Sequence, residues 1–320
     1  MSKDLILAVE TGGTKLQLVA GDKTGKIYFK KRVPVPLESG AQGTLDCIVN
    51  SVPEFLEKAA EIEGKIQRMG IGFGGAVNSK TQRVFASVQI PGWKDFPLSE
   101  YMEEKTGLPT RIYNDSNAAA WGEYVLGSGK NQAETFFYTN IGSGVGGGIV
   151  INGALYDGMG YGAGEFGQTY VADPWENKPF PGERVENLCS GWAIQERLRK
   201  MDIPQNSLLW QLCSRRQAEI TSKMFGEAVL KEDEFAVNFL DTVAHTFSLG
   251  LANVIDLISP EIIAVGGGVS LIGEPLISRL NTYTAQYIHY NNRGKYKIVQ
   301  SELGEMTVPV GTLLLTGQSE

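Results

Sequence analysis

Apolar residues in the first third of the chain fall into short runs that are separated by glycine or polar turns. The first run, residues 5–9, is followed directly by the glycine turn 10–15 and a second run, and Thr24-Gly25 then turns the chain into a third. Runs of this length between turn residues are typical of strands, so the chain is expected to open with three antiparallel strands. The strands expected in this part are residues 5–9, 16–20, 26–35, 68–73 and 110–113.

Helical spacing of apolar residues appears between these strands and after them. Apolar side chains three and four residues apart predict a helix over residues 44–62, in which Pro53 is expected to cause a break or a kink. The other expected helices are residues 97–106, 185–200, 208 onward, 234–257 and 308–316.

The second half of the chain opens in the same way as the first. Residues 135–139 are an apolar run, residues 140–148 a glycine turn and residues 149–151 a further run, with Asn152-Gly153 as the next hairpin signal. The expected strand 262–265 leads into a third glycine cluster. We interpret this pattern as a degenerate internal repeat of a β-hairpin followed by an αβ unit. A length of 320 residues also favours two domains.

Composition and charge narrow the function classes. The chain has 29 basic and 36 acidic residues and a net charge of −7, which disfavours nucleic acid or an anionic membrane surface as the main partner. No segment approaches the roughly 20 apolar residues of a membrane span. Cys47, Cys189 and Cys213 lack Cys-x-x-Cys spacing, so neither a disulfide framework nor a structural zinc site is indicated. No signal-peptide core precedes Glu10, and a cytoplasmic protein is expected.

Two glycine turns and a third glycine cluster are candidates for binding phosphate. Residues 142–147 match G-x-G-x-x-G, but a strand follows where a dinucleotide fingerprint needs a helix, and no Walker A sequence occurs. One such turn alone would indicate only a tight hairpin. Two turns in equivalent positions, together with the third cluster, indicate a nucleotide held by backbone N–H groups in a cleft between two domains. The candidate ATP-binding residues are Gly12, Gly13, Thr14, Lys15, Gly142, Ser143, Gly144, Gly146, Gly147, Gly266, Gly267 and Gly268. Glu10 is the candidate ligand for Mg²⁺, directly or through water.

Residues 112–121 place a carboxylate where a strand runs into a helix. Asn114, Asp115 and Ser116 are all N-cap candidates, and Gly127 closes the expected helix. An Asp at such a junction is held by the scaffold and open on one side, which suits a general base, although an ordinary helix cap would explain the same residues.

Together these stretches resemble the ROK family of sugar kinases (repressors, open reading frames, kinases). Residues 10–15 and 140–148 look like its two phosphate motifs, residues 264–270 like its adenosine motif and residues 114–119 like the sugar motif whose Asp is the family's catalytic base. Three further landmarks resemble the family: residues 90–93, 164–167 and 186–191. The resemblance implies an α/β, actin-like or hexokinase-like ATPase fold of duplicated ribonuclease H-like domains, with the active site in the interdomain cleft.

The resemblance also implies an activity and a set of site residues. It implies ATP-dependent phosphorylation of a hexose, at the 6-hydroxyl, with Asp115 as general base, ATP and Mg²⁺ as cofactors and a homodimer as the assembly. Family members act on glucose, fructose, mannose, allose and N-acetylated amino sugars. The expected smaller domain is residues 1–115 with a C-terminal helix at about 306–320, and the larger domain is residues 116–305. The implied sugar-binding residues are Gly75, Asn114, Glu165, Gln168 and Glu186.

The chain also departs from the family pattern. Family kinases usually carry a histidine, which helps to bind zinc, where this chain has Gln168, and no cysteine occurs between this residue and Glu186, so no zinc is expected. Glu10 stands in place of the usual Asp. The chain begins directly with the first kinase strand, so a DNA-binding role is not expected. Two alternatives stay open: a non-catalytic sugar sensor on a kinase scaffold, and an actin-like kinase for a non-hexose substrate.

Overall fold

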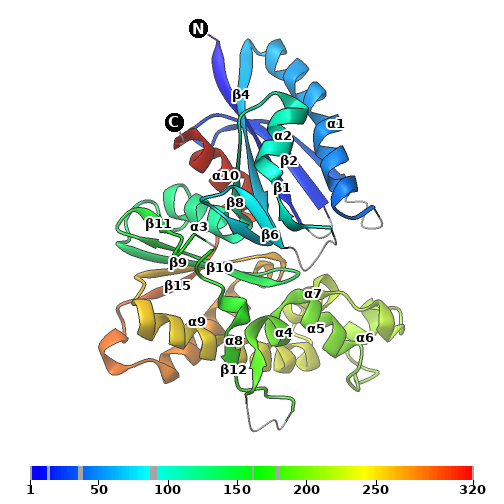
Figure 1. Ribbon diagram of the computed structural model, residues 1–320. Helices are drawn as coiled ribbons and strands as arrows, with labels where there is room; N and C mark the ends of the chain where they lie inside the picture. Colours follow the sequence, from blue (N-terminus) through cyan, green and yellow to red (C-terminus); the bar gives the residue numbers. More distant parts are fainter. Residues whose placement is uncertain are drawn as a thin grey trace.

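The computed structural model describes residues 2–12, 15–34, 39–86, 92–160, 162–176 and 181–318. They form two five-stranded sheets with helices around and between them (Figure 1). The strand order is β3-β2-β1-β4-β8 in the first sheet and β11-β10-β9-β14-β15 in the second. In both sheets the first three strands in sequence are antiparallel, and two later strands extend the sheet in parallel from its first strand. The repeat and the α/β class that the sequence predicts are therefore present.

The first sheet is buried because its central strands carry continuous apolar runs. Leu5, Leu7 and Val9 of β1 are completely buried in a core that also contains residues of α1 and α2. The strands are longer than the apolar runs, since polar residues at their ends still pair in the ladder. The bounds are β1 Lys3–Thr11, β2 Lys15–Gly21, β3 Ile27–Pro34, β4 Gly64–Phe73, β8 Thr110–Asn114, α1 Gly40–Glu61 and α2 Leu98–Thr106. A small three-stranded sheet, β5 Ala76–Asn78, β6 Arg83–Ala86 and β7 Lys94–Phe96, accompanies it.

Pro53, at which a break or a kink was expected, does not break α1. The helix continues through it as one element of 22 residues. Pro53 lies on the exposed face, where water can satisfy the carbonyl that loses its partner, while Ile48, Val52 and Phe55 are buried against the sheet.

The second sheet carries the second copy of the repeat, and a region of helices accompanies it. The sheet strands are β9 Thr135–Ile141, β10 Val145–Ile151, β11 Ala154–Tyr156, β14 Ile262–Gly266 and β15 Lys297–Gln300. The helices are α4 Val185–Cys189, α5 Gly191–Leu198, α6 Leu208–Leu212, α7 Ser222–Leu230, α8 Glu234–Ile258 and α9 Glu274–Tyr287, with short 3₁₀ turns between several of them. The single helix expected over residues 185–200 is wrong: Ser190 ends α4 and caps α5 through its Oγ, which accepts from the Ala193 N–H at 3.1 Å.

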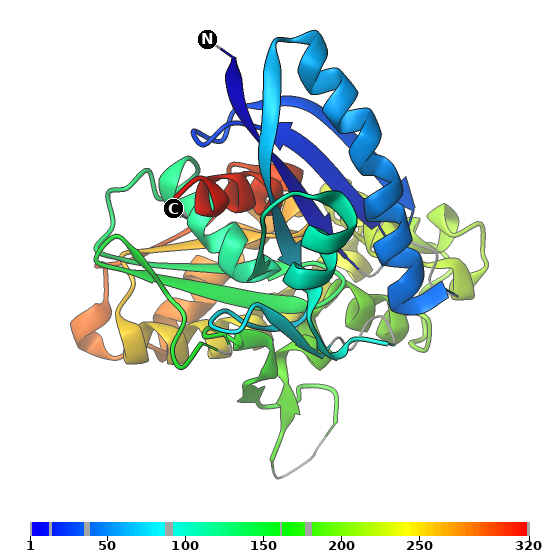
Figure 2. The ribbon, with the colours of Figure 1, turned by 45° about the horizontal axis from the view of Figure 1, so that its top comes forward.

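Two helices lie between the sheets. α3 Asp115–Val125 contacts β9 and β10, and α10 Thr307–Gln318 returns to β1 and β4 and crosses α3 (Figures 1 and 2). Glycines let the two backbones meet: a Cβ on Gly122 would lie 2.8 Å from the Thr307 carbonyl oxygen, and one on Gly311 would overlap the Ala118 carbonyl. The start of α3 is therefore held between the two halves of the molecule.

The hairpin of β12 Tyr170–Val171 and β13 Glu183–Arg184 projects from the body of the molecule (Figure 2). None of the helices in the described part of the chain combines the length and the apolar character that a membrane crossing requires.

Candidate active site

A cavity of about 340 Å³ opens between the two sheets and collects residues from both halves of the chain. Eight of the predicted site residues line it: Glu10, Gly12, Asp115, Gly142, Ser143, Gly266, Gly267 and Gly268. They come from the ends of β1, β9 and β14 and from the first turn of α3, and the parallel pairing of β14 with β9 brings the ends of these two strands side by side. Gly13 and Thr14 lie outside the described residues, and of Lys15 only its backbone place at the start of β2 is described.

Asp115 lies in the first turn of α3 and is not the residue that caps the helix. Asn114 is the N-cap, and its side-chain oxygen accepts from the Asn117 N–H at 3.0 Å. The Asp115 Oδ1 accepts from the Ser116 N–H at 2.7 Å and from the Ser116 hydroxyl at 3.2 Å. Burial raises the pKa of Asp115 to about 6 against these hydrogen bonds, and the negative charge of Glu165 adds to the rise. A carboxylate with this pKa is ionised at neutral pH and still basic enough to accept a proton.

Glu10 is another carboxylate that lines the cavity, besides Asp115 and Glu305. It is partly buried on β1, and its Oε2 accepts from Gln17 Nε2 at 3.4 Å. Mg²⁺ bound to a nucleotide needs only one or two protein carboxylates, because phosphate oxygens and water complete its octahedron. Glu10 suits that role. The described residues contain no group of three His, Cys, Asp or Glu that would make a complete protein cage for a metal.

The second glycine turn is shorter than the sequence predicts. Only Gly142 to Gly144 form the turn, where the Gly142 N–H donates to the Gly144 carbonyl at 2.9 Å, whereas Gly146 and Gly147 belong to β10. These strand glycines make room for neighbours: a Cβ on Gly146 would overlap the Ser116 hydroxyl, and one on Gly147 would lie 2.5 Å from the Gly164 carbonyl oxygen. Their position thus serves packing beside the turn.

Two side chains and the third glycine cluster hold the turn and its flanking strand ends, residues 140–146, which we call the phosphate hairpin. Asn140 Oδ1 accepts from the Gly146 N–H at 3.1 Å and its Nδ2 donates to the Gly144 carbonyl at 3.4 Å. Glu186 Oε2 accepts from the Val145 N–H at 2.9 Å. The third glycine cluster packs on the same turn, since Gly267 has a φ of 85° and a Cβ there would lie 2.5 Å from the Ile141 carbonyl oxygen.

Of the five predicted sugar-binding residues, none lines the cavity itself, and four form two hydrogen-bonded pairs. Asn114 Nδ2 donates to the Gly75 carbonyl at 3.1 Å. Gln168 Nε2 donates to Glu186 Oε1 at 3.2 Å. Glu165 is exposed as a whole residue, yet partial enclosure of its carboxyl raises its pKa, and the charge of Glu186 adds to the rise. The charge of Glu186 therefore acts on Glu165, and the charge of Glu165 acts on Asp115.

Two cavity residues of β9, Tyr138 and Asn140, are absent from the sequence-based site. Two positions apart on one strand, they face the same side, so alternation along β9 was the available signal. Burial raises the pKa of Tyr138, and the charges of Glu123 and Asp115 add to the rise. Gln300 at the end of β15 and Ser301, Gly304 and Glu305 after it also line the cavity, and this stretch carries no motif.

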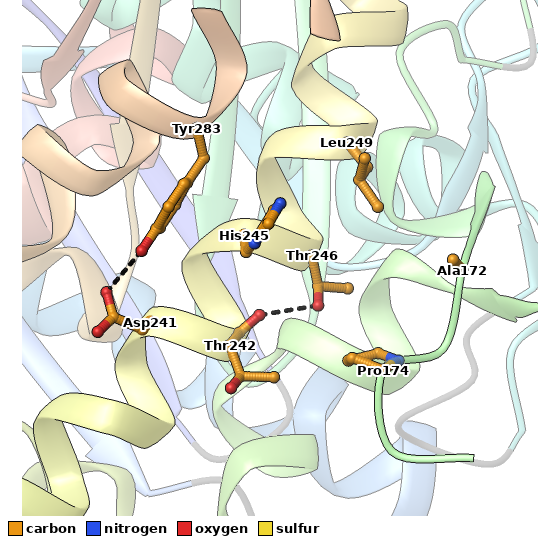
Figure 3. A pocket seen from close by; sticks show the side chains of 8 residues that line it. All are labelled: Ala172, Pro174, Asp241, Thr242, His245, Thr246, Leu249 and Tyr283. Carbon is orange, nitrogen blue, oxygen red and sulfur yellow. Dashed lines mark hydrogen bonds between the residues drawn. The ribbon is translucent and has the colours of Figure 1, made fainter. Parts of the chain in front are cut away.

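A second cavity, of about 320 Å³, lies between α8, α9 and the segment after β12 (Figure 3). Tyr283 stacks on His245 with ring centroids 4.6 Å apart, and its hydroxyl donates to Asp241 Oδ1 at 2.8 Å. Thr246 donates to the Thr242 carbonyl at 2.8 Å. These polar groups are bonded to one another, and no predicted site residue lines this cavity, so the interdomain cavity is the candidate active site.

Comparison with known proteins gives matches over nearly the whole chain. A sequence model of the ROK family matches residues 6–319. Glucokinase from Halalkalibacterium halodurans is 30% identical over 293 residues, which are 90% of this chain and 87% of that protein. The crystal structure of a ROK family glucokinase from Streptomyces griseus, in complex with glucose and AMPPNP, matches with a TM-score of 0.83 and 30% identity over 97% of this chain and 98% of that one. A putative xylose repressor from a Caldicellulosiruptor species is 25% identical over 89% of this chain and 72% of its own length.

Proposed function

Since the chain belongs to the ROK family, as its motifs predict, we propose that it transfers the γ-phosphoryl group of ATP to a hydroxyl of a hexose, with Asp115 as the general base. The chain has the hexokinase-like fold of this family and is an ATP-dependent sugar kinase. The observation that carries the residue assignment is the position of Asp115, with a pKa of about 6, in one cavity with the phosphate hairpin.

Phosphoryl transfer asks the protein mainly for positioning and for charge stabilisation. The Asp115 carboxylate accepts the proton of the attacking hydroxyl while the new O–P bond forms and the bond between the γ-phosphorus and the β,γ-bridging oxygen breaks, which releases ADP. With a pKa of about 6, Asp115 is about 90% ionised at pH 7. It therefore needs no further activation.

The nucleotide is assigned to the glycine side of the cavity. Gly12, Ser143 and the backbone of the phosphate hairpin are proposed to bind the β- and γ-phosphates, and Gly266 to Gly268 the adenosine. Gly13, Thr14 and Lys15 stay predictions of the same kind. Mg²⁺ held on the phosphates by Glu10, directly or through water, would neutralise charge that develops during transfer.

The sugar is assigned to the polar side chains next to Asp115. Asn114, Glu165, Gln168 and Glu186, with the backbone at Gly75, are proposed to bond the ring hydroxyls, because each hydroxyl both donates and accepts and a buried unpaired group is costly. The acceptor is proposed to be the 6-hydroxyl, since a primary hydroxyl extends from the ring and can reach Asp115 while the ring stays bound. The homodimer implied by the resemblance and the cytoplasmic location expected from the sequence stay predictions.

ATP-dependent phosphorylation across a panel of hexoses and N-acetylhexosamines in Mg²⁺, with Asp115→Asn beside the wild type, tests this function. We expect turnover of at least one sugar, with glucose as the first candidate, and a loss of about 10²–10⁴-fold in kcat in the variant with sugar binding retained. Sugar binding without turnover in the wild type would instead support a sugar sensor, and ATP binding without any hexose binding would support a kinase for another substrate.

A further inference from the structure

The segment that follows the predicted sugar loop (residues 162–168) is where the family resemblance implies a zinc site, and its residues do not fit one. Structural zinc needs four ligands drawn mainly from cysteine and histidine. Gln168 occupies the histidine position, and residues 169–185 contain neither cysteine nor histidine. Cys189 is the nearest cysteine beyond them, but its buried thiol donates to the Val243 carbonyl, and burial raises its pKa. The donor set of this chain therefore suits no zinc at the sugar loop.

A short antiparallel hairpin ties the two ends of this segment together. β12 pairs with β13, so that Tyr170 lies opposite Arg184. The Val185 N–H continues the pairing by donating to the Thr169 carbonyl at 2.9 Å. The Arg184 guanidinium lies 5.9 Å from the centre of the Tyr170 ring, which adds a cation–π contact across the pair. The chain leaving the sugar loop is thereby bonded to the chain entering α4.

Trp175 anchors the segment on the helical region. Its ring lies 4.0 Å from the Arg197 guanidinium of α5 and 5.8 Å from the Phe239 ring of α8. The Arg197 Nε is buried and has no hydrogen-bond partner within the described ranges, so the ring contact is a main interaction of this part of the guanidinium. An Asp173 turn, in which Oδ1 accepts from the Trp175 N–H at 2.9 Å, presents the ring. We call this arrangement the Trp175 clamp.

The hairpin and the clamp connect directly to both halves of the candidate active site. Gln168, the last residue of the sugar loop, donates to Glu186 Oε1, and the second oxygen of Glu186 accepts from the Val145 N–H of the phosphate hairpin. Glu186 follows β13 by two residues. Any movement of the hairpin would therefore shift the sugar loop and Glu186 together.

We propose that the β12–β13 hairpin and the Trp175 clamp hold the sugar loop without a metal, and that Trp175 is a positioning residue for sugar binding. The inference rests on the proposed function only where it concerns sugar. Trp175 acts through Gln168 and Glu186. Its loss is expected to weaken sugar binding more than ATP binding, because Asn140 and the third glycine cluster hold the glycine side of the cavity in addition to the one bond from Glu186.

The first test is independent of activity. The wild type is purified with zinc sulfate present and dialysed with or without 1,10-phenanthroline, and its zinc content and melting temperature are measured. We expect well below one zinc per chain and the same melting temperature in both samples. Stoichiometric zinc that stabilises the protein, and is lost with the chelator, would overturn the proposal that the hairpin and the Trp175 clamp hold the sugar loop without a metal.

The second test compares Trp175→Ala with Trp175→Phe and with a control, Tyr290→Ala, whose side chain is 71% exposed and far along the chain from the clamp. We expect Trp175→Ala to raise the KM for the sugar roughly tenfold, as removal of a partly buried cation–π contact implies, with the KM for ATP within about twofold. Trp175→Phe keeps an aromatic ring between Arg197 and Phe239 and should restore most of the sugar affinity.

Equal changes in both KM values, or no rescue by Trp175→Phe, would show a merely structural role and overturn the assignment. If Trp175→Ala does not fold, Arg197→Met decides the question, since it removes the charge over the ring and keeps an aliphatic chain of similar length. If the wild type phosphorylates no sugar, the proposed function fails, but the zinc content and the melting temperature still decide whether the sugar loop is held without a metal.

Discussion

Replacing Asp115 by Asn should remove catalysis and at the same time stabilise the fold at neutral pH. The folded pKa is raised from its ordinary value of 3.8 to about 6, chiefly by burial, so the ionised form is disfavoured in the folded state. Between pH 4 and 6 the folded state binds more protons than the unfolded state, and stability falls as pH rises through that window. The full cost at pH 7 is up to about 3 kcal/mol. Asn removes this cost and can still accept from Ser116.

Urea and thermal unfolding of the wild type and Asp115→Asn at pH 4.5, 6 and 7.5 would measure the effect. The variant should be more stable at pH 7.5, and the difference should shrink towards pH 4.5 because Asp115 of the wild type is then protonated. Asp95→Asn is the matched control: Asp95 is exposed and bonded to Arg83 at 2.8 Å, which lowers its pKa, so its replacement should not stabilise the protein at neutral pH. A variant that is no more stable than the wild type at pH 7.5 would refute the proposed cost of keeping the buried Asp115 carboxylate ionised.

The same pKa sets the pH dependence of turnover. The kcat/KM of the wild type should fall about tenfold for each pH unit below about 6, as protonation removes the base. Glu165→Gln should move this fall to lower pH, because the charge of Glu165 contributes to the raised pKa of Asp115. Loss of a sugar ligand would by itself raise the KM for the sugar without moving the pH profile, so a shifted profile reports the change in the pKa of Asp115. An unmoved profile would contradict the influence of Glu165 on that pKa.

Two further predictions concern the residues that fix α3. Gly148→Ala should destabilise the protein by about 1–3 kcal/mol in urea unfolding, because a Cβ would lie 2.6 Å from the Ala120 Cβ. Gly226→Ala in α7 is the control: its Cβ would meet only Ile272, at 3.4 Å, so this variant should be neutral or stabilising. Glu123→Ala should cost about 3 kcal/mol or more, since this fully buried carboxylate accepts hydrogen bonds from Ser128 and from residues 301–303, which would lose their acceptor; a change below about 1 kcal/mol in the same assay would contradict it.

The sequence was sufficient for the strands and for the repeat, because buried strands need continuous apolar runs and hairpins need turn residues. It was insufficient where a third element decides the structure. Gly146 and Gly147 look like part of a turn, yet both pair with β9 as strand residues, and they are glycines because Ser116 of α3 and the sugar loop leave no room for a Cβ. The break at Ser190 did have a local signal, since serine is a good N-cap and a poor helix interior residue.

The candidate site shows the same division. Asp115 and the glycine clusters were found because each combines a chemical group with a recognisable junction of strand and helix or strand and turn. Asn140, which bonds both sides of the phosphate hairpin, was read only as the edge of a motif. The contact of Glu186 with the Val145 N–H joins residues 41 positions apart, a distance at which one sequence carries no pairing signal.

The helix that begins with Asp115 is fixed along its whole length, and this bears on catalysis. Asn114 caps its first turn, and Glu123 bonds its last turn to the loop after β15. Gly148 of β10 and Gly311 of α10 admit its backbone on two sides at distances that no side chain would allow. A base that must meet a hydroxyl at hydrogen-bond distance gains from such rigidity, because a displacement of about 1 Å can cost about 10²-fold in rate. Under the proposed function, the glycines around α3 therefore serve the reaction through the position of the Asp115 carboxylate.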